Sequence, residues 1–182
     1  MLSKRKLRKK YALLRKKRYF SVKKDFYKPL NKIINFKKKK KISLYYPSNY
    51  EVDTFYLFKM LKEKYRASIS LPKILSSGRM KFVPWNFFNP LKVNKYGFLE
   101  PSNDSKMVFP EIIFVPLLAF DKFHNRLGYG KGFYDKFLSK YKENKKKLIT
   151  IGVAFSFQKY KKIPTTKSDM KLDYILTEKG IF

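Results

Sequence analysis

The sequence predicts an α/β fold with three layers, in which a mainly parallel sheet is flanked by helices. Segments with the composition of strands alternate along the chain with segments that have a helical spacing of apolar residues, as parallel sheets require. Residues 112–115 are apolar throughout and residues 148–155 nearly so, which is the pattern of strands covered on both faces. A chain of 182 residues also suits one domain, since domains of about 100–200 residues are the norm. We therefore expect residues 1–182 to form a single domain.

Two amphipathic helices are expected in the first 41 residues. Apolar side chains recur at helical spacing over residues 7–14 and again over residues 26–34, where Pro29 interrupts the stripe. An apolar stripe needs a surface to cover it, so we expect this basic helical segment, residues 1–41, to pack on the α/β core. The lysine run at 37–41 is interpreted as a solvated connector.

The remaining elements follow in chain order. Pro47 and Pro72 are expected to end the first two strands, because proline lacks the N–H that a sheet uses. Asp53 or Thr54 is expected to cap the helix between them. Residues 86–110 hold several Pro and a Gly and are interpreted as a loop with local structure. Strands are expected at 42–46, 67–71, 80–83, 112–115, 148–155 and 174–177, and helices at 53–64 and 132–141.

The net charge of +31 comes from 44 Lys and Arg against 13 Asp and Glu. Only seven of the basic residues are Arg, and Phe and Tyr, which like Lys have A/T-rich codons, are also abundant. We interpret the excess of Lys mainly as compositional, because proteins that read phosphates and bases favour Arg. An anionic ligand is expected and specific nucleic-acid binding is not, although a field of this strength attracts polyanions without selectivity.

Composition excludes several other classes of protein. No Cys is present, which rules out disulfides, thiolate metal ligands and a catalytic thiol. The longest apolar run, residues 112–120, is far shorter than the about 20 residues that a membrane helix needs. No apolar segment of the kind found in secretory signals follows the basic N-terminus. We expect a cytoplasmic protein that has no membrane partner and acts as a monomer.

The clearest chemical pattern lies between Arg126 and Asp135, in the sequence RLGYGKGFYD. Three of the seven Gly fall within five positions there, between an expected strand and an expected helix. Glycine lets a backbone approach a ligand closely, and the N–H groups at a helix start attract anions. With Lys131 and Arg126 alongside, the segment is expected to cradle phosphate groups. Neither the P-loop nor the dinucleotide motif fits, because Gly132 follows Lys131 and the spacing is G-x-G-x-G. A plain glycine turn on a charged surface is the alternative.

Other segments form a recognisable pattern together with residues 126–135. They are SKRKLR at 3–8, a strand and an EVDT turn within 42–54, VPLLAFD at 115–121, GVAFSFQ at 152–158 and DMKLD at 169–173. In this order they resemble the segments of the 5-formyltetrahydrofolate cyclo-ligase family, also called 5,10-methenyltetrahydrofolate synthetases, and residues 126–135 resemble its signature. The resemblance is collinear over residues 3–178. It implies a fold similar to the NagB/RpiA/CoA-transferase-like fold.

The resemblance also implies which residues form the site. ATP contacts correspond to Lys4, Arg8, Arg126, Leu127, Gly128, Tyr129, Gly130, Lys131, Gly132, Phe133 and Tyr134. Folate contacts correspond to Tyr46, Glu51, Tyr96, Tyr129 and Phe133, and the acids that match Mg²⁺ ligands are Asp135 and Asp173. Lys131, Arg126 and Tyr134 are expected to act in catalysis. Asp169, a single acid in an expected loop, is expected to be solvent-exposed.

The reaction implied by the resemblance converts 5-formyltetrahydrofolate to 5,10-methenyltetrahydrofolate, with ATP as co-substrate and Mg²⁺ as cofactor. Transfer of the γ-phosphoryl group to the formyl oxygen makes phosphate the leaving group when N10 attacks. Such a step depends on positioning and charge neutralisation rather than on a protein nucleophile. Two alternatives stay open. One is a basic nucleic-acid-binding protein on the same fold, and the other is an ATP-dependent enzyme that acts on a different folate-like or acyl substrate.

Overall fold

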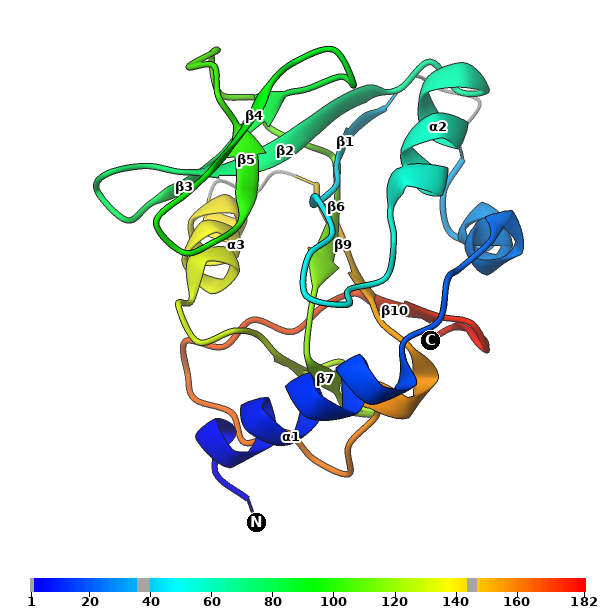
Figure 1. Cartoon of the computed structure of the whole chain (residues 1–182), viewed down its shortest axis with the longest axis vertical. Coiled ribbons are helices and arrows are strands. Elements are labelled where there is room, and N and C mark those ends of the chain that lie inside the picture. Colours follow the sequence, from blue (N-terminus) through cyan, green and yellow to red (C-terminus); the bar gives the residue numbers. More distant parts are fainter. Residues whose placement is uncertain (1, 36–39, 144–146) are drawn as a thin grey trace.

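The computed structural model describes residues 2–35, 40–143 and 147–182 (Figure 1). Residues 37–39 of the expected lysine connector lie outside these ranges. In the described part of the chain, no helix is long and apolar enough to cross a membrane.

The central sheet has seven strands in the order β11-β10-β9-β6-β1-β2-β3. Neighbouring strands from β10 to β2 are parallel, and the two edge strands, β11 and β3, are antiparallel to their neighbours. The expectation of a mainly parallel sheet is therefore confirmed. The strands are β1 (Lys41–Ser43), β2 (Ser68–Ile74), β3 (Met80–Pro84), β6 (Ile112–Pro116), β9 (Ile149–Val153), β10 (Tyr174–Thr177) and β11 (Gly180–Ile181).

Alternate side chains of β6 show how the three layers are held together. Ile112 and Phe114 are buried in a cluster with apolar residues of helix α2 (Phe55–Glu63) and of the 3₁₀ helix η1 (Lys24–Lys32). Ile113 and Val115 are buried with residues of helix α3 (Phe133–Glu143). Because successive side chains of a strand point to opposite faces, α3 covers one face of the sheet and α2 with η1 covers the other (Figure 1).

Helix α1 (Lys4–Arg18) packs on a small hairpin that follows β6 (Figure 1). The hairpin consists of β7 (Ala119–Phe120) and β8 (Arg126–Leu127). Leu7 and Tyr11 are buried with Leu118, Leu127 and Ile163, and the Ser3 side chain accepts a hydrogen bond from the first turn of the helix. These contacts place α1 beside the segment 126–135.

Several parts of the fold differ from the expectation. The first strand ends at Ser43 rather than at Pro47, and the second amphipathic helix is the 3₁₀ helix η1. Strand β2 continues through Pro72 to Ile74, because β1 pairs only with Ser68–Ser70 and Pro72 has no neighbour on that side that would need its missing N–H. The expected loop 86–110 contains an antiparallel hairpin of β4 (Leu91–Val93) and β5 (Leu99–Pro101). The Asn94 side chain accepts hydrogen bonds from two N–H groups of its turn, and Gly97 there has φ +80°, which favours glycine.

Candidate active site

A cavity of about 1210 Å³ opens between the segment 126–135, helices α1 and α3, and the β4–β5 hairpin. Its volume exceeds the about 300–1,000 Å³ of most single-ligand sites, so two ligands can lie side by side. The walls include segments that follow β1 and β6, and in open parallel sheets ligands bind at the carboxyl ends of strands. All site residues expected from the sequence line this cavity except Tyr96 and Asp173.

The glycine loop, residues 128–132, is held against α1 by Arg8. Arg8 Nε donates a hydrogen bond of 2.9 Å to the carbonyl oxygen of Gly128. Gly130 has φ +101°, and a Cβ atom built there would stand 3.1 Å from Arg8 Cζ. Only glycine satisfies both the backbone angle and the close approach. The loop leads into α3, whose first N–H groups are unpaired within the helix and suited to an anion.

Arg126 is a buried cation that fixes the segment. Its Nη2 donates to Asp135 Oδ1 at 2.9 Å and its Nη1 donates to the carbonyl oxygen of Met170 at 2.9 Å. Burial lowers the pKa of Arg126, and the neighbouring Asp135 carboxylate opposes that effect. Arg126 therefore holds the loop, α3 and the segment near Met170 together. The Asp135 carboxylate partly balances the positive charge of Arg126.

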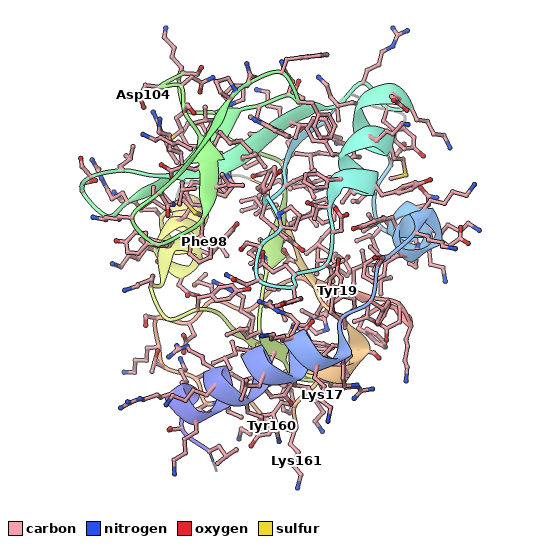
Figure 2. All side chains as sticks on the ribbon, viewed as in Figure 1. Lys17, Tyr19, Phe98, Asp104, Tyr160 and Lys161 are labelled. Atoms are coloured by element: carbon pink, nitrogen blue, oxygen red, sulfur yellow. The ribbon has the colours of Figure 1, made fainter. Side chains whose placement is uncertain are left out.

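Lys131, by contrast, is exposed. Its Nζ lies 5.3 Å from the centroid of the Tyr96 ring, and the Tyr96 ring lies 5.1 Å from the ring of Phe133. Tyr96 belongs to the turn of the β4–β5 hairpin, so this hairpin reaches the glycine loop through aromatic contacts. Phe98 (labelled in Figure 2) strengthens the same contact, because its ring lies 5.8 Å from that of Tyr129.

Tyr134 lines the cavity at the start of α3. Its hydroxyl is buried and has no hydrogen-bond partner among the described residues. Burial raises the pKa of Tyr134, so the hydroxyl keeps its proton. A buried donor without a partner is unusual in native proteins, and here it is available to a ligand.

A second group of polar residues lines the cavity around Glu51. Its carboxylate accepts hydrogen bonds from the Tyr129 hydroxyl and from the N–H of Ser48 at 2.9 Å. Tyr129 in turn accepts a hydrogen bond of 2.7 Å from Nη1 of Arg15. Burial raises the pKa of Glu51 above its ordinary value, and the contacts with Arg15, Tyr129 and Ser48 only partly oppose that rise. Tyr46 stands nearby in a group of rings, 5.0 Å from Phe55 and 6.2 Å from Trp85.

Lys4 and Asp169 close the end of the cavity where α1 begins. Lys4 Nζ donates to Asp169 Oδ2 at 2.5 Å, and both residues line the cavity. Asp169 is less exposed than the sequence led us to expect, because only 24% of its side chain remains accessible. Burial raises the pKa of Asp169, but the contacts with Lys4 and Thr166 outweigh burial and leave that pKa lowered.

Comparison with known proteins places this geometry in a family. A sequence profile of the 5-formyltetrahydrofolate cyclo-ligase family matches residues 2–178. The chain belongs to this family. The cyclo-ligase of Haemophilus influenzae is 33% identical over 150 residues, which cover 79% of this chain and 79% of that protein.

Solved structures of related proteins agree with the fold. The NMR structure of Aquifex aeolicus 5,10-methenyltetrahydrofolate synthetase matches with a TM-score of 0.77 and 31% identity, over 99% of this chain and 92% of that one. A 5,10-methenyltetrahydrofolate synthetase from Mycoplasma pneumoniae matches with a TM-score of 0.69 and 25% identity, over 96% and 98%.

The two acids that the cyclo-ligase resemblance assigned to Mg²⁺ have different surroundings. Asp135 lines the cavity. Asp173 does not line it, and its Oδ2 accepts hydrogen bonds of 2.7 Å from both the N–H and the hydroxyl of Thr150. Asp173 precedes β10, at the amino end of that strand, whereas ligands bind at carboxyl ends. The described residues contain no cluster of three or more metal-ligating side chains, so the pairing of these two acids stays a prediction.

Sequence reasoning did not single out Arg15, which donates a hydrogen bond to Tyr129 of the cavity wall. Lys4, Arg8, Tyr11 and Arg15 follow each other at spacings of four, three and four, which places them on one face of a helix. That face is the one that meets the hairpin and the glycine loop. The spacing was therefore a usable signal, hidden in a helix where ten of fifteen residues are basic.

Proposed function

We propose that this chain binds ATP and 5-formyltetrahydrofolate side by side in the cavity and converts them to 5,10-methenyltetrahydrofolate, ADP and phosphate. Membership of the cyclo-ligase family supports the reaction. The assignment of the site rests on one observation, which is that two chemically different groups of residues line the same cavity. The glycine loop and the cations of α1 form one wall, and Glu51 and Tyr46 stand on another.

ATP phosphates fit the glycine loop because three kinds of positive group meet there. The loop and the start of α3 offer N–H groups, Arg8 and Lys4 approach from α1, and Lys131 stands above Tyr96. A cation over an exposed ring gains about 0.5–1 kcal/mol, less than the about 1.5–3 kcal/mol of a charge-assisted hydrogen bond. A phosphate therefore draws Lys131 away from Tyr96 and onto the nucleotide.

The folate is assigned to the side of the cavity around Glu51. The reduced pterin ring carries N–H donors, and a buried carboxylate is a strong acceptor for them. Tyr129 contacts that carboxylate, and Tyr46 and Phe133 supply further aromatic surface on the cavity wall. Tyr96 does not line the cavity in this structure, and its expected contact with the folate stays a prediction.

The chemistry balances with ATP as the only activating reagent. The formyl oxygen attacks the γ-phosphorus and ADP leaves, which gives an imidate phosphate. N10 then adds to the formyl carbon and gives up its proton, the C–O bond breaks, and phosphate departs as the ring closes. Lys131 and the loop N–H groups stabilise the charge on the transferring phosphoryl group, Arg126 positions the loop, and the Tyr134 hydroxyl offers one further donor. Every one of these groups acts by placement and charge, as phosphoryl transfer requires.

Of the two carboxylates expected to bind Mg²⁺, only that of Asp135 is suitably placed in this structure. Among the described residues, the hydrogen bonds of Asp135 with Arg126 and Met170 all use Oδ1, so Oδ2 can bind a cation. A Mg²⁺ ion commonly takes one or two carboxylates together with substrate phosphates and water. When bound, it would neutralise charge on the phosphates. Asp173 does not fit the same ion while its carboxylate is held by Thr150.

The test is to mix the purified protein with ATP, Mg²⁺ and 5-formyltetrahydrofolate. We expect ADP and methenyltetrahydrofolate to form in equal amounts. ADP formed only when a different acyl or folate-like compound is supplied would favour the alternative substrate. No turnover of either reagent, together with tight binding of RNA or DNA, would favour the nucleic-acid-binding alternative.

A further inference from the structure

Arg15 is a buried cation that none of the expected site assignments includes. Only 2% of its surface is exposed. Its Nη1 donates to the Tyr129 hydroxyl at 2.7 Å and to the carbonyl oxygen of Leu117 at 3.3 Å, and its Cζ lies 5.5 Å from the centroid of the Tyr129 ring. A guanidinium buried to this extent needs compensating negative charge. Glu51 supplies it through Tyr129.

We propose that Arg15 is a positioning residue for the folate side of the cavity, which holds Tyr129, and through Tyr129 the side chain of Glu51, in a fixed orientation. This inference rests on the proposed function, because it assigns Arg15 a part in the binding of the same substrate. Arg15 does not itself line the cavity. It acts through Tyr129, whose hydroxyl accepts a hydrogen bond from Arg15 and donates one to Glu51.

The chain of three residues joins three separate parts of the molecule. Arg15 comes from α1, Tyr129 stands between two glycines of the loop, and Glu51 lies in the turn that leads to α2. The loop alone would leave Tyr129 mobile, since Gly128 and Gly130 flank it and glycine gives the backbone wide freedom. The hydrogen bond from Arg15 fixes a side chain that is assigned to both the nucleotide and the folate.

Charge supports the same role. Glu51 is faced by Arg15 of α1, Tyr129 of the loop, Tyr134 of α3, and Tyr45 beyond β1. The three tyrosines have raised pKa values and are neutral under ordinary conditions, so Arg15 is the cation in this group. Without Arg15 the pKa of Glu51 rises further, and a smaller fraction of Glu51 is ionised to accept hydrogen bonds from the folate.

The experiment compares Arg15→Leu with Arg5→Leu. Arg5 lies on the exposed side of the same helix, so the control removes an equal charge from the same element. Binding of 5-formyltetrahydrofolate and of a non-hydrolysable ATP analogue is measured by calorimetry, and turnover is measured across pH. For Arg15→Leu we expect folate binding to weaken at least about 30-fold, the lower range for truncating one member of a buried charged network. Lys4 and Arg8 remain in place, so we expect the affinity for the ATP analogue to stay within about threefold.

The pH profile separates positioning from simple support of the fold. In Arg15→Leu, the acid limb of kcat/KM for the folate should move to higher pH, because the pKa of Glu51 rises. Arg15→Lys keeps a cation, so the acid limb of its pH profile should stay near the original position. Glu51→Gln removes the titrating carboxyl group, so the acid limb should disappear. Equal loss of affinity for both ligands, an unmoved acid limb, or an equal effect of Arg5→Leu would each overturn the proposal.

Two further outcomes stay interpretable. If Arg15→Leu does not fold, Arg15→Lys decides, and a loss of both ligands in that variant would again overturn the positioning role. If the unaltered protein binds both ligands but forms no methenyl product, the proposed function fails, while the binding data still test Arg15 separately.

Discussion

Both faces of helix α1 carry Lys and Arg, but the surroundings of these cations differ between the two faces. On the inner face, Lys4, Arg8 and Arg15 each donate to a defined acceptor in another segment of the chain. On the outer face, the basic residues are exposed to solvent, including Lys17 (labelled in Figure 2); they are Arg5, Lys6, Lys9, Lys10, Lys16 and Lys17. The difference shows that the number of cations says little about function here. What distinguishes the inner cations is that a partner and a cavity fix their positions.

The largest loss of activity is expected for Lys131, the cation that we assign to the transferred phosphoryl group. Lys131→Ala should lower kcat about 10²–10³-fold, by analogy with the removal of a donor aimed at developing charge. Lys131 is exposed, so thermal unfolding should change little. The matched control is Lys9→Ala on the outer face of α1, assayed at saturating ATP. An equal reduction of kcat in the control would mean that total charge, and not placement, governs the rate.

A smaller loss of activity is expected for Arg8, which donates its hydrogen bond to the backbone of the glycine loop. Arg8→Ala removes the hydrogen bond to Gly128 and the cation packed against Gly130. We expect KM for ATP to rise about 30-fold, within the range for truncating a buried charged contact, while KM for the folate changes much less. Steady-state kinetics with each substrate varied in turn measure this split. A rise confined to the folate would reverse the assignment of the two walls.

Most of the sheet could be predicted from local pattern. The apolar runs of β6, β9 and β10 indicate buried parallel strands, since only strands covered on both faces lack polar positions. The β4–β5 hairpin was not predicted, because its strands have only three residues each. β4 is mostly exposed, and the buried residues of β5 are Glu100 and Pro101, which form no apolar alternation. Pro and Gly in this segment indicate a loop equally well.

The site divides in the same way between local and distant information. Residues 126–135 are contiguous, so glycine spacing and neighbouring cations predict a phosphate cradle from the sequence alone. Arg15 and Tyr129 are 114 positions apart, and Lys4 and Asp169 are 165 apart. Helical spacing places Arg15 on the face of Lys4 and Arg8, but it does not identify the partner of Arg15. Nothing local distinguishes Asp169 from an exposed loop acid. Only the docking of α1 on the hairpin brings these partners together.

The Lys4–Asp169 pair should have a modest effect on stability. The pKa of Asp169 is lowered from its ordinary 3.8, so the pair stabilises the folded state fully above that value. The contribution disappears as the pH falls through the lowered pKa, because the carboxylate then takes up a proton. We expect Asp169→Asn to cost about 1 kcal/mol or less at neutral pH, as for other accessible ion pairs. Urea unfolding of both proteins at pH 7 and near pH 2 tests this, and the difference between them should vanish at the lower pH.

The smallest effect on catalysis is expected from the outer face. Lys9, Lys10 and Lys16 are exposed, so changing all three to Gln removes three charges without disturbing the contacts of the inner face. We expect kcat and both KM values to stay within about twofold, because exposed charges are screened over about 10 Å at 0.1 M salt.

The affinity of the triple variant for RNA or DNA of arbitrary sequence should, in contrast, change. Removing a lysine that neutralises a phosphate reduces the slope of log K against log salt by about 0.7–0.9, so the triple variant should bind polyanions more weakly and with a shallower salt dependence. Fluorescence anisotropy over a series of salt concentrations measures the slope. A triple variant with unchanged polyanion binding would place that property elsewhere on the surface, and one with impaired turnover would show that the outer face also serves the reaction.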